Sequence, residues 1–414
     1  MLDVWPELPI VIDFLATAMR PRVMANIVAA LKQHHRVRKI DIRGIPNPLM
    51  EEFAAMKEPF PELTSLKLNS DDEHVPILSD SFLDGSAQHL HTLDLDGIPF
   101  LAVRKLPLST RNLVSLRLWS IPHSGYISPE AMVNCLSALT GLKSFDLGFR
   151  SPQSRFGRVP SLTRIIHTAL TKFGFKGNSE YLEDIVSLID TPLLNHFEIT
   201  FFNQLIFDTP LLRHFICRTE TIKAHYRTSV AFYDRRVEVR FSPQEGTVVH
   251  EGLCLGISCT PSDWQLSSLT QACSSSLPPL STLEHLKILS YRTHWKDDIE
   301  STQWLEFLYP FTSVKNLDLS DELVPLIAPA LQALGGERVT EVLPMLQNLL
   351  FDGLGLSRFA EKAIQQFIDT RQRSGHTVAL LKKGHIRPHL RIDTSVPSES
   401  NPLLWAPGGY SSIL

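Results

Sequence analysis

The sequence lacks a surplus of charge of either sign. Its 414 residues carry 40 Lys and Arg against 44 Asp and Glu, a formal net charge of −4. A nucleic-acid-binding surface would usually show a clustered basic excess, so we expect no nucleic-acid partner. An anionic membrane is not favoured either, and no window approaches the roughly 18 uninterrupted apolar residues of a membrane-spanning helix.

Cysteine is scarce, and its pattern does not suggest paired thiols. The five cysteines stand at irregular spacings, and the sequence has no Asn-x-Ser/Thr sequon. A secreted repeat protein of this size would usually carry a paired disulfide framework. The N-terminus has an apolar patch, but Asp3 and Glu7 replace the positive start of a signal peptide. We therefore expect an intracellular protein, in the cytoplasm or the nucleus.

Motifs that carry chemistry are also missing. There is no Gly-x-Gly-x-x-Gly, no Gly-Lys-Ser/Thr, no Gly-x-Ser-x-Gly and no His-Glu-x-x-His. Cys254, Cys259 and Cys273 could suggest a metal site, but zinc usually needs a tight Cys pair matched by a second pair. We expect no enzyme activity, no cofactor and no metal. The alternative is an active site hidden in residues 213–282, which a cluster of perturbed titratable groups would mark.

One phrase recurs along the chain: an apolar residue, two others, an apolar residue, one other, an apolar residue. Its first seven copies begin 26, 27, 23, 29, 28 and 24 residues apart, at Val37, Leu63, Leu90, Leu113, Leu142, Leu170 and Leu194. A weaker copy begins at Leu212, and late copies begin at Leu283, Val314 and Leu346. This spacing predicts an α/β leucine-rich-repeat solenoid, a horseshoe with a parallel concave sheet and helices on the convex side.

Each phrase predicts a short strand whose last two apolar residues point into the core. Helices should lie between the strands, and Ser128-Pro129-Glu130 is a typical helix start because it combines a cap, a proline and an acid. Apolar stripes predict further helices over 179–189, 323–334 and 360–375. If all helices pack on one side of the strands, the other face of the sheet stays open. Repeat character is expected to be present by Val37.

The predicted domain organisation is a solenoid over residues 1–385 and a flexible tail over 386–414. The repeat rhythm is irregular over 213–282, where two β-rich runs flank Asp234 and predict either a hairpin or two degenerate repeats. A strand is expected at 253–257, and 265–280 suggests a helix followed by a loop. The tail is rich in proline and has no period.

The open face should display mixed charge and one large aromatic side chain. Mixed charge suits protein recognition, although it also suits a face that is merely solvated. A tryptophan beside an arginine has the composition of an interface hot spot, although Trp119 could instead fold over the sheet edge as local core. The same register places Arg218 on this face. The candidate protein-binding residues are Lys67, Asp94, Arg117, Trp119, Asp146, Lys172 and Glu198.

Several stretches resemble a family, the F-box-associated leucine-rich-repeat proteins expanded in mushroom-type fungi. They are residues 34–47, 54–68, 170–210, 255–286, 297–320 and 328–349. The resemblance implies an F-box that docks a Skp-type adaptor of a cullin–RING ubiquitin ligase, with the repeats holding the substrate. Residues 5–9 only faintly echo the Leu-Pro-x-Glu start of an F-box. We therefore expect the substrate-recognition part of such a receptor, which would hold the adaptor only through an F-box outside this chain. The alternative is a ligase-independent interaction scaffold.

Overall fold

A computed structural model of the chain describes most of the sequence up to Lys382. The described residues are 8–15, 20–56, 58–72, 75–78, 83, 87–110, 112–152, 164–204, 207–223, 227–242, 252–259, 262–275, 277, 280–292, 295, 299–351 and 357–382. The expected tail at 386–414 lies outside them. No helix in the described part is long and apolar enough to cross a membrane.

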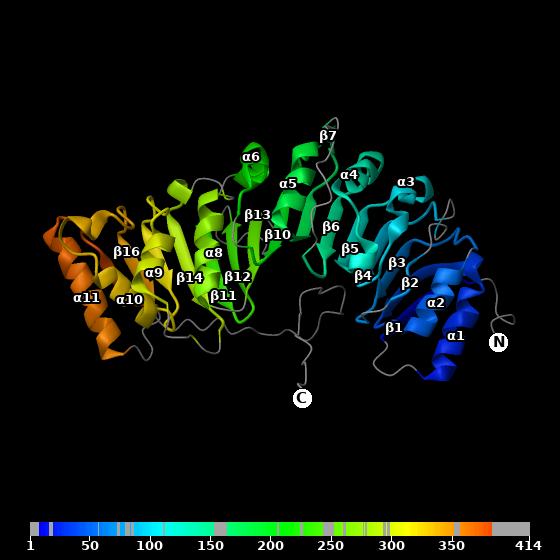
Figure 1. The fold of residues 1–414 in the computed structure, drawn as a ribbon, viewed down its shortest axis with the longest axis horizontal. Coiled ribbons are helices and arrows are strands. Elements are labelled where there is room, and N and C mark those ends of the chain that lie inside the picture. The colour runs from blue at the N-terminus through cyan, green and yellow to red at the C-terminus, as the bar shows by residue number, and fades with distance from the viewer. Residues whose placement is uncertain are drawn as a thin grey trace.

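One sheet of fifteen strands runs through the whole molecule, which is arched (Figure 1). Its strand order is β1-β2-β3-β4-β5-β6-β8-β10-β13-β12-β11-β14-β15-β16-β17. The bounds are β1 Ile10–Leu15, β2 Val37–Arg43, β3 Ser65–Asn69, β4 Thr92–Asp96, β5 Ser115–Ile121, β6 Ser144–Phe149, β8 Lys172–Gly177, β10 His196–Phe202, β11 Arg227–Tyr233, β12 Arg236–Ser242, β13 Gly252–Ser258, β14 His285–Ser290, β15 Asn316–Leu319, β16 Asn348–Phe351 and β17 Ala379–Lys382. The short strands β7 (Ile165–Ile166) and β9 (Ile189–Asp190) form a separate sheet of two strands.

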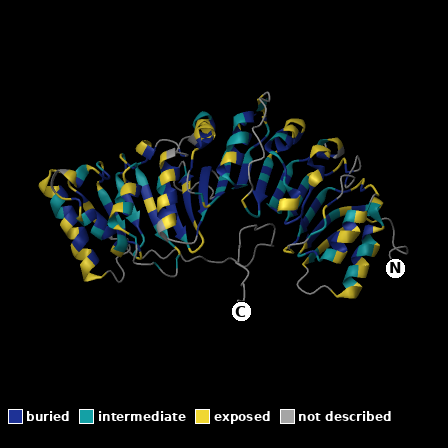
Figure 2. Cartoon of the chain, in the orientation of Figure 1, coloured by how far each residue is buried: buried dark blue, intermediate teal, exposed yellow. Residues whose placement is uncertain are grey.

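Helices cover one face of the large sheet, and Figure 2 shows their exposed sides turned outward. Their bounds are α1 Pro21–Leu31, α2 Asn47–Ala55, α3 Leu106–Ser109, α4 Pro129–Ala138, α5 Ser179–Leu188, α6 Pro210–Arg218, α7 Glu220–Lys223, α8 Ser262–Ser275, α9 Ser301–Leu308, α10 Val324–Gln332 and α11 Arg358–Arg373. The predicted cap of α4 is confirmed, because Ser128 Oγ accepts a hydrogen bond from the Ala131 amide at 3.2 Å.

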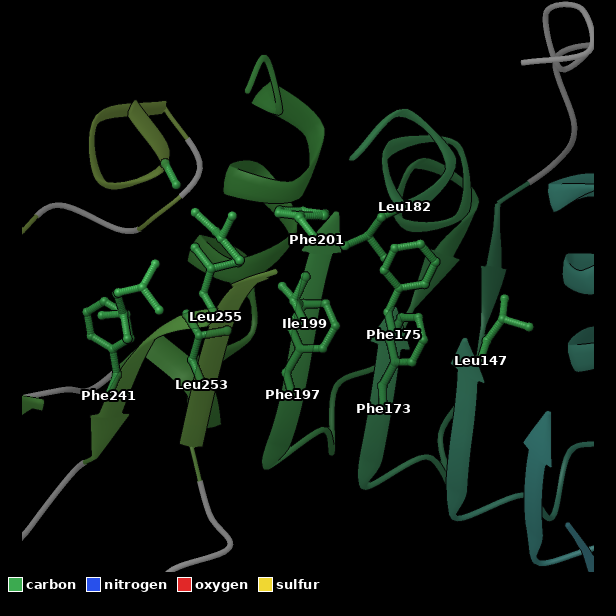
Figure 3. Close-up of a cluster of buried hydrophobic side chains, with 14 of the residues drawn as sticks. Leu147, Phe173, Phe175, Leu182, Phe197, Ile199, Phe201, Phe241, Leu253 and Leu255 are labelled. Atoms are coloured by element: carbon green, nitrogen blue, oxygen red, sulfur yellow. The ribbon is translucent and has the colours of Figure 1, made fainter. Parts of the chain in front are cut away.

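The core lies between the helices and the sheet. The apolar residues of each phrase are buried in register, so Leu93 pairs with Leu116 and Phe145 pairs with Phe173. Phe145, Phe173 and Phe197 stack along the sheet, with ring centroids 5.3 and 5.1 Å apart. Figure 3 shows Phe173 and Phe197 on neighbouring strands. The alternate residues of the strands point away from this core, because side chains alternate along a strand. The chain is a leucine-rich-repeat solenoid of the predicted α/β class.

The irregular region contains a hairpin, so the first of the two alternatives is correct. Strand β12 pairs antiparallel with β11 and with β13. We call these three strands the meander. The meander joins two parallel arms, because β13 pairs parallel with β10 and β11 pairs parallel with β14. One continuous sheet therefore passes through the break in the repeat. The predicted strand at 253–257 and helix after 265 are present as β13 and α8.

Strand β1 and helix α1 precede the first phrase, and β1 pairs parallel with β2, so the sheet extends further toward the N-terminus than the phrase at Val37. One sequence-based expectation is wrong. The weaker phrase at Leu212 forms helix α6 and not a strand: Leu212, Phe215 and Ile216 are buried at helical spacing behind a proline at the helix start. Arg218 is therefore not on the open face. Its guanidinium donates to the carbonyls of Val186 and Ile189, at 3.3 and 2.6 Å.

Candidate binding face

The open face consists of the strand residues that point away from the helices. Strand pairing places Lys67 opposite Asp94, Asp94 opposite Arg117, and Arg117 opposite Asp146. Strand pairing therefore places these four residues in a ladder of alternating charge across β3 to β6. Its role in binding stays a prediction.

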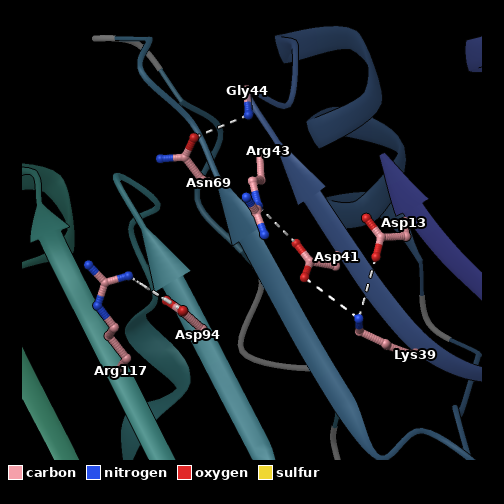
Figure 4. A network of polar contacts seen from close by, with 8 residues as sticks. All are labelled: Asp13, Lys39, Asp41, Arg43, Gly44, Asn69, Asp94 and Arg117. Atoms are coloured by element: carbon pink, nitrogen blue, oxygen red, sulfur yellow. Dashed lines mark hydrogen bonds and ion pairs between the residues drawn. The ribbon is translucent and has the colours of Figure 1, made fainter. Parts of the chain in front are cut away.

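The charges of this ladder largely satisfy one another. A nitrogen of Arg117 lies 3.2 Å from a carboxylate oxygen of Asp94 (Figure 4). Another lies 3.5 Å from a carboxylate oxygen of Asp96. Burial raises the pKa of Asp94, although the adjacent Arg117 opposes this shift. Asp146 leans across the open position at Gly174 and contacts Lys172 at 3.4 Å. Because these groups are already paired, a partner gains little from each of them.

Trp119 stands on the open face by the ordinary alternation of β5, opposite Asp96, and an irregularity in the strand lies directly at it. The pairing with β6 shifts between Leu118 and Ile121, so Trp119 and Ser120 together stand opposite Gly148. Such a bulge redirects the side chains at it, and it often lies beside functional sites. The backbone of Ser120 has φ 49°, in the left-handed region that residues other than Gly, Asn and Asp rarely adopt.

The indole of Trp119 lies flat on the sheet above Gly148. A Cβ atom at Gly148 would stand 2.6 Å from Trp119 Cε3, so only glycine leaves room for the ring. The guanidinium of Arg117 lies 5.4 Å from the ring centroid. The indole Nε1–H has no hydrogen-bond acceptor among the described residues. The side chain is half-buried, and it belongs to the open face and not to the core beneath it.

Glu198 lies further along the same face, on β10. Its carboxylate is 3.8 Å from His196 Nε2, and the hydrogen bond from His196 lowers the pKa of Glu198 despite burial. It pairs in register with Cys254 on β13. Burial raises the pKa of the Cys254 thiol well above its ordinary value, so the thiol stays protonated and unreactive. No three His, Cys, Asp or Glu residues gather to hold a metal ion within the described ranges.

Sequence reasoning missed part of this face. Tyr233, Arg236 and Tyr291 also lie on this face, near the same ends of the strands as Trp119. Phe202 stands at an outward register position of β10, and its half-buried side chain also packs against the core. Phe202 could have been found, since it continues the alternation of His196 and Glu198 along β10. The outward position of Tyr233 and Arg236 depends on the hairpin register, which the sequence left open between two alternatives.

Comparisons with known proteins do not assign this chain to a family. No protein-family model matches the chain, and no curated protein matches it. Among solved structures, the leucine-rich repeat-containing protein LegL7 from Legionella pneumophila is similar, with 14% sequence identity and a TM-score of 0.30. The match covers 79% of this chain and 97% of that one. The fold assignment rests on the repeat and the sheet of this chain, and the F-box association rests on the sequence resemblance alone.

Proposed function

We propose that this chain is a non-enzymatic protein-binding module and that its open face holds a partner polypeptide. The observation that carries the proposal is the placement of Trp119. Strand alternation places this large aromatic side chain on the open face, the glycine opposite gives its ring room, and a bulge with a left-handed serine lies beside it. A left-handed non-glycine residue costs about 1 kcal/mol, and such strain clusters at binding and active sites.

The Trp119 side chain lies above the core and does not close it. The core beneath it is closed by Leu118 and Leu147, which are 1% and 0% exposed. A half-buried tryptophan beside an arginine on an open face offers a partner a large rigid surface, and such residues dominate the binding energy of interfaces. The paired charges around it, from Lys67 to Glu198, would contribute orientation and specificity more than affinity.

The experiment compares Trp119→Ala with Trp264→Ala. Trp264 lies on helix α8, on the covered side of the sheet, and its side chain is 50% exposed, so it is a matched control. We expect Trp119→Ala to weaken binding of the captured partner by about 2 kcal/mol or more, roughly 30-fold. Thermal stability should change little. Equal capture by both variants would contradict the proposal.

We further propose that the module is the substrate-recognition part of an F-box type receptor of a cullin–RING ubiquitin ligase. The support is the resemblance of the repeat stretches to the fungal F-box-associated family. The chain itself should not bind a Skp-type adaptor, because Leu8 and Pro9 lead into strand β1 where an F-box would begin a helix. The alternative is an interaction scaffold that acts without a ligase. A pull-down with purified adaptor tests this, and capture at micromolar affinity would show that an adaptor site is present after all.

A further inference from the structure

Five aromatic and cationic side chains form a row along one edge of the open face. They stand at the edge where the parallel strands end and β12 begins, and Ser258 of β13 lies between the strands β10 and β12 at this position. The row consists of Lys176 on β8, Phe202 on β10, Arg236 on β12, Tyr233 on β11 and Tyr291 directly after β14. We call these residues the rim row. Trp119 on β5 extends it, because its opposite residue Gly148 pairs with Lys176.

Members of the rim row hold one another in place. Lys176 Nζ lies 5.9 Å from the ring centroid of Phe202, and the Arg236 guanidinium lies 4.6 Å from that of Tyr233. The rings of Tyr233 and Tyr291 stack 5.1 Å apart, with an interplanar angle of 17°. Tyr291 remains 59% exposed. The side chains are thus ordered before any partner arrives, which reduces the entropy that binding costs.

Arg236 of the rim row shares its acidic partner with a second arginine. Arg236 contacts Glu238 at 3.4 Å, but Glu238 also accepts a hydrogen bond from Arg240 at 2.6 Å. One carboxylate therefore serves two guanidiniums, each of which has five N–H donors. The side chains of Arg236 and Arg240 are 50% and 44% exposed, whereas that of Glu238 is 10% exposed.

We infer that the rim row binds an extended acidic segment of the partner protein, an inference that rests on the proposed function. Seven steps between strands separate β5 from β14, and at about 4.8 Å each they span roughly 34 Å. About ten residues of extended chain cover this length. Three steps separate Lys176 from Arg236, roughly 14 Å, or about four residues of extended chain. The segment therefore carries carboxylates about four residues apart, with an aromatic or apolar residue between them for Phe202.

Acidic residues beside the rim row select a polypeptide over a nucleic acid. A phosphate backbone laid along the row would pass close to Asp96 on β4 and Glu238 on β12. Phosphates carry one charge at every step and cannot avoid these carboxylates, whereas a peptide can place neutral residues opposite them. Single-stranded DNA is therefore a competing ligand that the test includes.

The test pans a random twelve-residue peptide library displayed on phage against the full chain. We expect enriched peptides with two acidic residues about four positions apart around an aromatic or apolar residue. Their affinity should fall at least tenfold in Arg236→Gln and in Tyr291→Ala, and it should fall when salt is raised from 50 to 300 mM. The matched controls are Arg373→Gln and Tyr309→Ala, which change exposed residues on the helical side of the sheet. Both should bind like the parent chain.

Each other outcome has a defined meaning. Peptides that lack the acidic pattern, or that bind the two rim-row variants unchanged but lose affinity in Trp119→Ala, overturn this inference and leave the proposed function standing. Peptides that bind all open-face variants unchanged, or no enrichment at all, overturn both. Binding of an oligothymidine with the same dependence on Arg236 and Tyr291 would assign the rim row to single-stranded nucleic acid, against the inference.

Discussion

The parallel arm from β3 to β6 and the meander from β11 to β13 build the same sheet by different means. In the parallel arm, successive repeats place charges opposite one another, and Asp94 and Arg117 on neighbouring strands neutralise each other. In the meander the pairing runs along one strand, because Arg236 and Arg240 both contact Glu238 on β12. The parallel arm therefore distributes its charges across strands, whereas the meander concentrates three of them on one.

The two regions also differ in their cores. The parallel arm has an unbroken row of apolar side chains, and leucine gives way to stacked phenylalanine at Phe145. In the meander the same row contains Thr228, which pairs with Phe241 and Leu286 and is 2% exposed. Its hydroxyl has no hydrogen-bond partner among the described residues. The meander thus has a buried polar group at a core position that is apolar in the strands of the parallel arm.

The largest effect is expected from Leu317→Asp in the C-terminal arm. Leu317 is 0% exposed and pairs with Leu286 and Leu349. Burying an unpaired carboxylate there should cost about 4 kcal/mol or more and unfold β14 to β17. In a repeat protein each unit depends on its neighbours, so amide exchange should stay slow in β3 to β6 beyond the meander. Unchanged melting would show that the register is wrong, and uniform loss of protection would show that the meander does not separate the arms. Asp318→Asn, one residue further on the open face, is the control.

The next effect compares the two charge arrangements through Glu238→Gln and Asp94→Asn. Glu238→Gln leaves two guanidiniums beside a neutral amide and should cost about 2 kcal/mol. Asp94→Asn should change stability by less than about 0.5 kcal/mol, because Arg117 keeps Asp96 at 3.5 Å. The raised pKa of Asp94 acts in the same direction: ionisation of this carboxyl opposes folding as the pH rises through its titration, and asparagine removes that cost. Denaturant unfolding at neutral pH measures both, and equal losses would remove the distinction between the regions.

The smallest effect is a gain in stability from Thr228→Val in the meander. Valine has the shape of threonine without the hydroxyl, so the substitution removes an unpartnered polar group and should stabilise the chain by about 1 kcal/mol. Thr92→Val, at a half-buried outward position on β4, should have little effect. A loss of stability in Thr228→Val would mean that the hydroxyl has a partner that the described residues do not include.

The regular repeats could be predicted from the sequence because their phrase combines strand alternation with a fixed spacing. That pattern gave the register of Lys67, Asp94, Arg117 and Asp146. The pattern gave the wrong element at Leu212. Apolar residues three positions apart, such as Leu212 and Phe215, occur in helices as well as in the strand phrase. The pattern also missed β1, whose alternating residues lack the leucine phrase. The rim row could not be predicted as a unit, because it depends on the meander bringing Arg236 and Tyr233 beside residues more than thirty positions away.

The central claim is that the open face of the sheet, and not the helical side, meets the partner. Oxidative footprinting of aromatic side chains tests it most directly, with the chain alone and with its most enriched panned peptide bound. The account predicts that Trp119 and Tyr291 become protected from oxidation, while Trp264 and Tyr309, which are 50% and 62% exposed, react at the same rate in both states. Protection of Trp264 and Tyr309 with unchanged oxidation of Trp119 and Tyr291 would contradict it.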